Sequence, residues 1–308
     1  MNRRKLLRTA AVVGAGGAAV ATAGIATAAG REGAPTYVFV NGANGTGMGF
    51  NALGLRGHRS VAVELPGHTE GHFPIEYQAP QDLITWANME SPMRNVGLDD
   101  YVQATIDVVK TVAEYGPVIL VGQSMGGATI TKVGNAIPEY IDHMVYDTAY
   151  CCVELETMYE YTQTDENEGS LGDSLAPWIV GDPQKIGAIR MNWRSADPEF
   201  VAAAKAAYLA DGTDEAILSL LAALQPDESI AAITENAQVE KDTWGTIPRT
   251  YIRHTRDKML PIALQNRMID EADALTPDNP FNVHSVKASH VGTAKAHKKI
   301  LEILVDLA

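Results

Sequence analysis

The chain of 308 residues is 46% hydrophobic and 20% charged, an ordinary composition for a globular protein that can bury one large core. Its formal net charge is −14, and removing the four basic residues of positions 1–30 leaves −18 on the remainder. A body this acidic argues against nucleic acid and anionic membranes as partners. A surface kept soluble by its acidic residues explains the charge.

The first 30 residues predict an export signal. Arg3 and Arg4 open a short basic segment, and an uncharged stretch rich in Ala, Gly and Val follows from Thr9 to Gly30. Its end, Ala26–Ala28, matches a small-residue cleavage site. An uncleaved anchor or a cytoplasmic tail is the alternative, but a stretch this rich in Ala and Gly is only weakly apolar. We therefore expect a twin-arginine-type signal, export to the cell envelope or medium, and no stable membrane insertion.

Beyond residue 31, short continuous apolar runs alternate with helical patterns. Such runs suit strands buried on both faces of a parallel sheet. The expected strands are Thr36–Val40, Ser60–Leu65, Pro117–Val121, Met144–Thr148, Thr250–His254 and Phe281–Val286. The expected helices between them are Leu98–Tyr115, Met125–Ala136, Pro261–Ala274 and Gly292–Leu307. The alternation predicts an α/β fold over residues 31–308, with a mostly parallel sheet of about six strands flanked by helices.

Residues 153–245 interrupt this alternation. They contain no convincing strand, and their helical patterns cover Pro183–Asn192, Pro198–Leu209 and Asp214–Ala223. We expect a helical cap insertion over the carboxyl edge of the sheet, where ligands bind in such folds. A surface excursion without substrate contact is the alternative. Possible apolar lining residues, each of which could equally serve packing, are Met158, Tyr159, Tyr161, Trp178, Ile179, Met191 and Trp193.

The most informative motif is a G-x-S-x-G sequence between an expected strand and an expected helix. This context is typical of a nucleophile elbow, a turn so tight that the positions two before and two after the serine must be nearly free of side chain. Gly122 and Gly126 meet that requirement around Ser124. The helix start adds partial positive charge where an oxyanion develops. The motif therefore predicts Ser124 as a catalytic nucleophile.

A serine nucleophile needs a base, and this fold presents its partners in the order serine, acid, histidine. His290 lies between the last expected strand and the last helix, whereas His284 lies inside that strand. Asp257 follows the penultimate strand, where an acid can orient the imidazole. Asp147 is the rival acid because it ends an earlier strand, and a surface ion pair is the alternative role of Asp257. We expect a catalytic triad of Ser124, Asp257 and His290.

An oxyanion hole requires two backbone N–H groups. The N–H of Met125, directly after the nucleophile, is expected to supply one. The loop after the first strand, residues 41–47, is expected to supply the other through the N–H of Ala43, because its glycines permit close approach to a ligand. An ordinary glycine-rich turn is the alternative explanation of this loop. No cofactor or metal is implied, since the histidines lack the spacing of metal ligands.

Together these residues resemble the α/β-hydrolase superfamily, and within it the plant methylesterase and hydroxynitrile-lyase branch with its bacterial esterase relatives. The resemblance runs from about residue 37 to the end of the chain. It is strongest at Val40–Gly47, Val118–Gly127, Trp244–Pro261 and His290, and it is faint across the cap insertion.

Three positions of this branch bear on the chemistry. The lyases carry Thr directly after the first residue of the oxyanion motif and Lys directly after the catalytic His. Gly42 and Val291 occupy these positions here, and both favour the esterases. Asn41 stands where the family usually has His, a departure that bears on the shape of the oxyanion loop.

The triad and the resemblance predict a serine hydrolase that acts on carboxylic esters through an acyl-enzyme, as an esterase, methylesterase or lactonase. A modest apolar ester or lactone suits an apolar pocket with few polar groups. Two alternatives stay open. One is a hydroxynitrile-lyase-like or other non-hydrolytic enzyme on the same triad, and the other is a ligand-binding protein that keeps the fold without turnover.

Deletion of Arg3 and Arg4 is expected to retain the protein inside the cell, because this pair defines a twin-arginine signal. Immunoblots of the cell and medium fractions measure the effect. Wild-type levels of export by the deletion variant would contradict the predicted route.

Overall fold

The computed structural model describes residues 33–46, 50–68 and 73–308. The expected export signal at residues 1–30 lies outside these ranges and stays a prediction. Within them, no helix combines the length and the hydrophobicity needed to span a bilayer.

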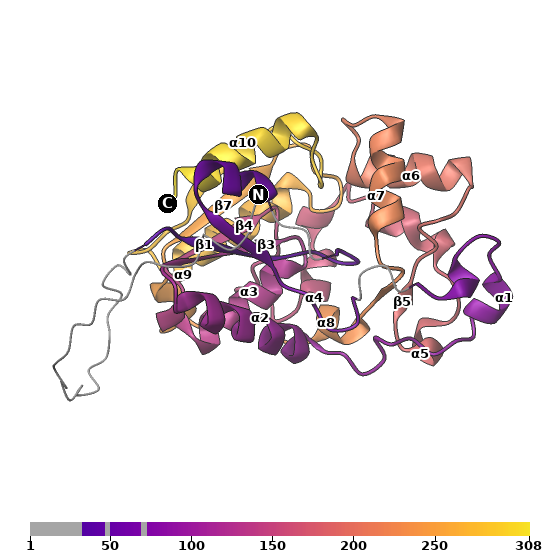
Figure 1. Ribbon diagram of the computed structural model, residues 1–308, viewed down its shortest axis with the longest axis horizontal. Coiled ribbons are helices and arrows are strands. Elements are labelled where there is room, and N and C mark those ends of the chain that lie inside the picture. Colours follow the sequence, from indigo (N-terminus) through magenta and orange to yellow (C-terminus); the bar gives the residue numbers. More distant parts are fainter. Residues whose placement is uncertain (1–32, 47–49, 69–72) are drawn as a thin grey trace, which may run out of the picture.

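A six-stranded sheet forms the centre of the fold, and each pair of neighbouring strands is parallel (Figure 1). The strands, in spatial order, are β2 (Arg59–Ala62), β1 (Thr36–Val40), β3 (Val118–Gln123), β4 (His143–Asp147), β7 (Arg249–His254) and β8 (Asn282–Val286). The predicted α/β fold with a parallel sheet is confirmed. The expected strand positions agree with the observed ones to within a few residues.

Helices cover both faces of the sheet because the central strands are apolar on both sides. On β1, Val38 and Val40 pack into the core beneath one helical layer, whereas Tyr37 and Phe39 pack into the core on the opposite face. The first layer comprises α2 (Leu98–Ala113), α3 (Gly126–Ala136) and α9 (Ile262–Leu275), and the second comprises the 3-10 helix η1 (Asn51–Arg56) and α10 (Ala294–Val305).

The parallel register brings the ends of several strands to one edge of the sheet. Gln123 at the end of β3 is paired with Asp147 at the end of β4, and His254 at the end of β7 is paired with Val286 at the end of β8. The loops that follow these strands therefore begin side by side. Ser124, Thr148, Asp257 and His290 all belong to these loops.

The residues between β4 and β7 form the insertion. Two short helices, α4 (Met158–Thr162) and α8 (Ile230–Thr234), contact each other, and α8 also contacts α2. Residues 171–228, here named the cap body, lie at the right of Figure 1. This body contains α5 (Pro183–Ile186), α6 (Pro198–Tyr208) and α7 (Asp214–Ala223), and α1 (Leu83–Trp86) lies beside it (Figure 1).

Two expectations for the insertion were wrong. The helix expected over Pro183–Asn192 ends at Ile186, because Gly187 takes a left-handed conformation (φ 81°) that caps it. The segment expected to lack strands contains a short antiparallel pair, β5 (Ile189–Arg190) with β6 (Asp227–Glu228). A buried ion pair joins these two strands, since Nε and Nη2 of Arg190 both donate to the Asp227 carboxylate at 2.7 Å.

Candidate active site

Ser124 occupies a strained turn between β3 and α3. Its φ is +52°, a conformation uncommon for residues other than glycine. Close packing forces the turn: a Cβ atom at Gly126 would lie 2.4 Å from the carbonyl oxygen of Val40. The G-x-S-x-G motif therefore produces the expected tight elbow, with the Ser124 side chain partly exposed.

His290 and Asp257 are in contact. Nδ1 of His290 lies 2.6 Å from Oδ2 of Asp257, and the two residues are 5% and 4% exposed. His284, the less favoured histidine, lies within β8 as expected. The structure thus brings together the histidine and the acid expected from the sequence, 33 positions apart, from the loops after β8 and β7.

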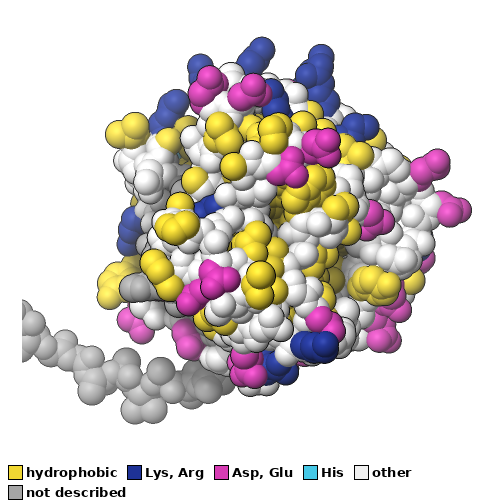
Figure 2. All heavy atoms as spheres, turned by 90° about the vertical axis from the view of Figure 1, so that its right-hand side faces the viewer, with side chains coloured by type: hydrophobic (Ala, Val, Ile, Leu, Met, Phe, Trp, Pro, Cys, Tyr) yellow, Lys and Arg dark blue, Asp and Glu magenta, His cyan; other side chains and the backbone are white. Residues whose placement is uncertain are grey.

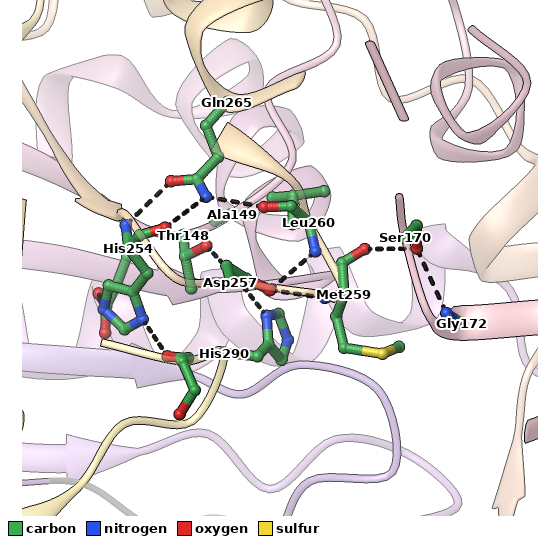
Figure 3. A network of polar contacts seen from close by, with 12 residues as sticks. Thr148, Ala149, Ser170, Gly172, His254, Asp257, Met259, Leu260, Gln265 and His290 are labelled. Atoms are coloured by element: carbon green, nitrogen blue, oxygen red, sulfur yellow. Dashed lines mark hydrogen bonds and ion pairs between the residues drawn. The ribbon is translucent and has the colours of Figure 1, made fainter. Parts of the chain in front are cut away.

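The Asp257 carboxylate accepts three further hydrogen bonds (Figure 3). The hydroxyl of Thr148 donates to Oδ2 at 2.6 Å, and the N–H groups of Met259 and Leu260 donate to Oδ1 at 2.7 and 2.9 Å. Burial alone would raise the pKa of Asp257. His290 and these hydrogen bonds outweigh burial and hold that pKa below its ordinary value, so the group is a carboxylate at neutral pH.

Thr148 was not anticipated from the sequence. It follows β4 with φ of +41°, which is an outlier for a β-branched residue. Such strain persists only where the surroundings impose it, and here it aims the Thr148 hydroxyl at Asp257. The apolar run of β4 gives no hint of this role, because the signal is a backbone angle.

Ser124 and His290 line the same cavity, which has a volume of about 160 Å³. Asn41, Gln123 and Thr46 supply polar groups at the sheet edge. The remaining walls are mainly apolar, and they comprise Tyr208, Leu220, Ala223, Leu224, Met259 and Val291. The cap body contributes Tyr208, Leu220, Ala223 and Leu224, so α6 and α7 cover the carboxyl edge above Ser124.

The apolar side chains suggested by the insertion sequence pack elsewhere. Met158 and Tyr161 are buried in the main core, Met191 and Trp193 belong to the core of the cap body, and Tyr159 is 53% exposed. Trp178 and Ile179 pack against the cap core. None of these seven described residues lines the cavity with Ser124. Figure 2 shows the cap-body side, where apolar side chains are scattered among charged ones and no histidine is visible.

The loop after β1 lies directly against Ser124. A Cβ atom at Gly42 would lie 2.7 Å from Cβ of Ser124, so no side chain fits there. The Gly45 N–H donates to the Gly42 carbonyl at 3.0 Å and closes a turn over Ala43 and Asn44, with Asn44 at φ +57°. Ala43 lines the cavity, and Met125 immediately precedes α3. Both expected oxyanion donors therefore belong to backbone that flanks Ser124.

Glu228 holds this loop from the cap body. Its Oε2 accepts the Asn44 N–H at 2.6 Å, and its Oε1 accepts the Tyr101 hydroxyl at 2.8 Å. Nε2 of His68 lies 3.1 Å from the same carboxylate, and Glu228 is 1% exposed. Burial acts to raise the pKa of Glu228, but His68 and these hydrogen bonds lower it below its ordinary value. Sequence reasoning missed this residue because 184 positions separate it from Asn44.

Asp147, the rival acid, contacts a different histidine. Its Oδ1 lies 3.0 Å from Nε2 of His254, which is completely buried. The structure therefore pairs each acid with its own histidine, Asp257 with His290 and Asp147 with His254.

The sheet order and the serine turn define an α/β-hydrolase architecture. The model of the alpha/beta hydrolase family matches residues 37–294, and the chain belongs to that family. A curated relative named pyrethroid hydrolase, from Sphingobium wenxiniae, is 24% identical over 279 residues, which cover 88% of this chain and 86% of the relative.

Solved structures show the same fold. A pyrethroid hydrolase from Sphingobium faniae JZ-2 superposes with a TM-score of 0.65 at 22% identity, covering 89% of this chain and 97% of that one. Polyneuridine aldehyde esterase superposes with a TM-score of 0.63 at 19% identity, covering 89% and 99%. The expected membership of the α/β-hydrolase superfamily is confirmed by the family match, and these two likenesses show a shared fold.

Replacing Thr148 with Val is expected to lower the unfolding free energy at pH 7 by about 1.5–3 kcal/mol, because a hydrogen bond to a buried carboxylate is lost. The folded-state pKa of Asp257 lies below its ordinary value, so this stabilisation is complete above that ordinary value. It is lost as the pH falls through the folded-state pKa.

Urea unfolding at neutral pH and at about pH 3 tests this dependence. The difference between the Thr148→Val variant and wild type should shrink at acidic pH, and Thr148→Ser, which keeps the hydroxyl, should stay close to wild type. A difference that is the same at both pH values would contradict the assignment to ionised Asp257.

Proposed function

We propose that the protein is a serine hydrolase that cleaves carboxylic esters through Ser124, His290 and Asp257. The observation that carries the proposal is the cavity shared by Ser124 and His290, with His290 bonded to a buried carboxylate. The names of the similar proteins, pyrethroid hydrolase and polyneuridine aldehyde esterase, support the same reaction class.

In the proposed reaction, Oγ of Ser124 adds to the carbonyl carbon of the ester while His290 takes the serine proton. Asp257 holds the ring of His290 and stabilises the imidazolium. The N–H groups of Met125 and Ala43 stabilise the oxyanion. Collapse breaks the bond to the alkoxy group, which receives the proton from His290 and leaves as an alcohol. Water then attacks the acyl-enzyme by the same steps and releases the acid and free Ser124.

Two positions favour hydrolysis over cyanohydrin cleavage on the same triad. Gly42 has no room for the threonine of the lyases, because any Cβ atom would collide with Ser124. Val291 places an apolar side chain in the cavity where the lyases carry lysine. None of the described residues that line the cavity is a lysine or an arginine, so none supplies the fixed cation that would stabilise a departing cyanide.

The cavity favours a neutral substrate with a compact group at the reacting carbonyl. The described residues that line it include no aspartate, glutamate, lysine or arginine. Its volume of about 160 Å³ is below the roughly 300–1,000 Å³ usual for ligand sites. A small apolar ester or lactone suits this space.

Ser124→Ala is expected to lower kcat for p-nitrophenyl acetate by at least about 10³-fold, because the nucleophile is lost. Labelling with a fluorophosphonate, followed by mass spectrometry, should place the adduct on Ser124. Ser174→Ala, at an exposed serine, is the matched control and should retain wild-type kcat. Equal turnover by the Ser124→Ala and wild-type proteins would refute the nucleophile assignment and favour a binding protein.

Glu228→Gln is expected to lower kcat about tenfold with little change in KM. The variant loses the charge that strengthens the bond to the Asn44 N–H, so the oxyanion loop is held less firmly. Steady-state kinetics with p-nitrophenyl esters measure the effect, with Glu199→Gln at an exposed glutamate as the control. Unchanged kcat in Glu228→Gln would show that Glu228 has no part in holding the loop.

Export remains part of the proposal. The twin-arginine pattern of residues 1–30 supports secretion of the folded hydrolase to the cell envelope or medium.

A further inference from the structure

A second acid–histidine pair lies beneath the proposed triad. Oδ1 of Asp147 and Nε2 of His254 are 3.0 Å apart, and the two residues are 6% and 0% exposed. Neither lines the cavity that holds Ser124. A pair this buried is costly unless its remaining polar groups are satisfied, so its other contacts indicate what it does.

Those contacts reach the Ser124 turn and the loop that carries His290. The other ring nitrogen of His254, Nδ1, lies 2.9 Å from the carbonyl oxygen of Ser289, the residue immediately before His290. On the opposite side, the backbone carbonyl of Asp147 accepts the N–H of Ser124 at 3.4 Å. The pair therefore connects the nucleophile turn to the loop that carries the base.

The contacts also define the protonation of His254. A carbonyl oxygen can only accept, so Nδ1 donates to Ser289, and Nε2 faces the Asp147 carboxylate, which also accepts. The Ser289 carbonyl thus sets the proton on Nδ1, and the negative charge of Asp147, 3.0 Å from Nε2, favours a proton there as well. Burial acts to lower the pKa of His254, but Asp147, with Asp257 further away, raises it above its ordinary value.

The side chain of Gln265 holds the backbone of His254 in place as well. The side-chain oxygen of Gln265 accepts the His254 N–H at 3.0 Å, and the Gln265 amide donates to the carbonyls of His254 and Leu260 at 3.1 and 2.7 Å. Leu260 in turn donates to Asp257. His254 thus belongs to a hydrogen-bond network that also includes the Asp257 carboxylate (Figure 3).

We propose that Asp147 and His254 are positioning residues: an imidazolium held by Asp147 donates a hydrogen bond to the Ser289 carbonyl and so fixes His290 against Asp257 and Ser124. The inference rests on the proposed function, because it assigns a role in the reaction of that triad. The pair does not touch the substrate. Its contribution is to keep His290 at its place, where a displacement of about 1 Å can cost about 10²-fold in rate.

Two substitutions of His254 separate its two contacts. An asparagine places its amide nitrogen near the position of Nδ1 and can still donate to Ser289, whereas a glutamine reaches the position of Nε2 and contacts Asp147 only. Kinetics are measured per active site titrated with fluorophosphonate, so that loss of folded protein does not count as loss of rate. We expect His254→Gln to lower kcat at least about tenfold with KM nearly unchanged.

His254→Asn should stay within about threefold of wild-type kcat, because the asparagine keeps the hydrogen bond to Ser289. A purely structural role predicts a lower melting temperature for both variants with unchanged kcat per titrated site, and that result would overturn the proposal. Equal losses of kcat in both variants would overturn it as well. Failure of the proposed function is recognised separately, by turnover in Ser124→Ala.

A further measurement uses the wild-type protein and so does not depend on whether a variant folds. Nitrogen chemical shifts of the histidine rings distinguish protonated from unprotonated nitrogens, and His254 should show both of its nitrogens protonated at neutral pH. An unprotonated Nδ1 on His254 would remove the hydrogen bond to Ser289 and overturn the proposal even if neither variant can be purified.

Discussion

The absence of space around the Ser124 turn is the constraint on which the site depends. The start of α3 packs against the end of β1 so closely that Gly126 cannot carry a side chain, and the loop after β1 packs against Ser124 so closely that Gly42 cannot either. These contacts join β1, β3 and α3 into one rigid unit. Ser124 and the loop after β1 therefore have fixed positions relative to each other before any ligand binds, which is the preorganisation that the proposed reaction requires.

Electrostatics shape the other half of the site. A carboxylate as buried as Asp257 is stable because a histidine, a hydroxyl and two backbone N–H groups compensate for the lost water. These donors come from three different loops. Asp147, one position before Thr148, adds its own buried pair with His254. The end of β4 thus supplies both Asp147 and the hydroxyl that binds Asp257, and the positive φ lies at Thr148, the second of these two residues.

The fold and the three proposed triad residues could be predicted because their signals are local. Strand runs, the glycines around Ser124 and the loop positions of Asp257 and His290 are readable within a few residues. Glu228 and His254 carry no such signal, since their partners lie 184 and 107 positions away and a lone acid or histidine has many possible roles. The cavity walls in the insertion could not be assigned either, because an apolar pattern marks a buried face without showing whether protein or ligand covers it.

The contacts of Glu228 also bear on how the protein could be re-engineered. The cap body holds the oxyanion loop through Glu228 and contacts both neighbours of His290, since Tyr208 accepts the Val291 N–H and Asp211 is bonded to the Ser289 hydroxyl. The two parts are thus interdependent rather than modular. A chimera that exchanges residues 171–228 for those of a relative receives new cavity walls. It also loses the contacts that Glu228, Tyr208 and Asp211 make with the loops around Ser124 and His290, unless the relative's segment supplies equivalent ones. Compatibility at these three attachment points, more than overall similarity, decides whether such a graft is active.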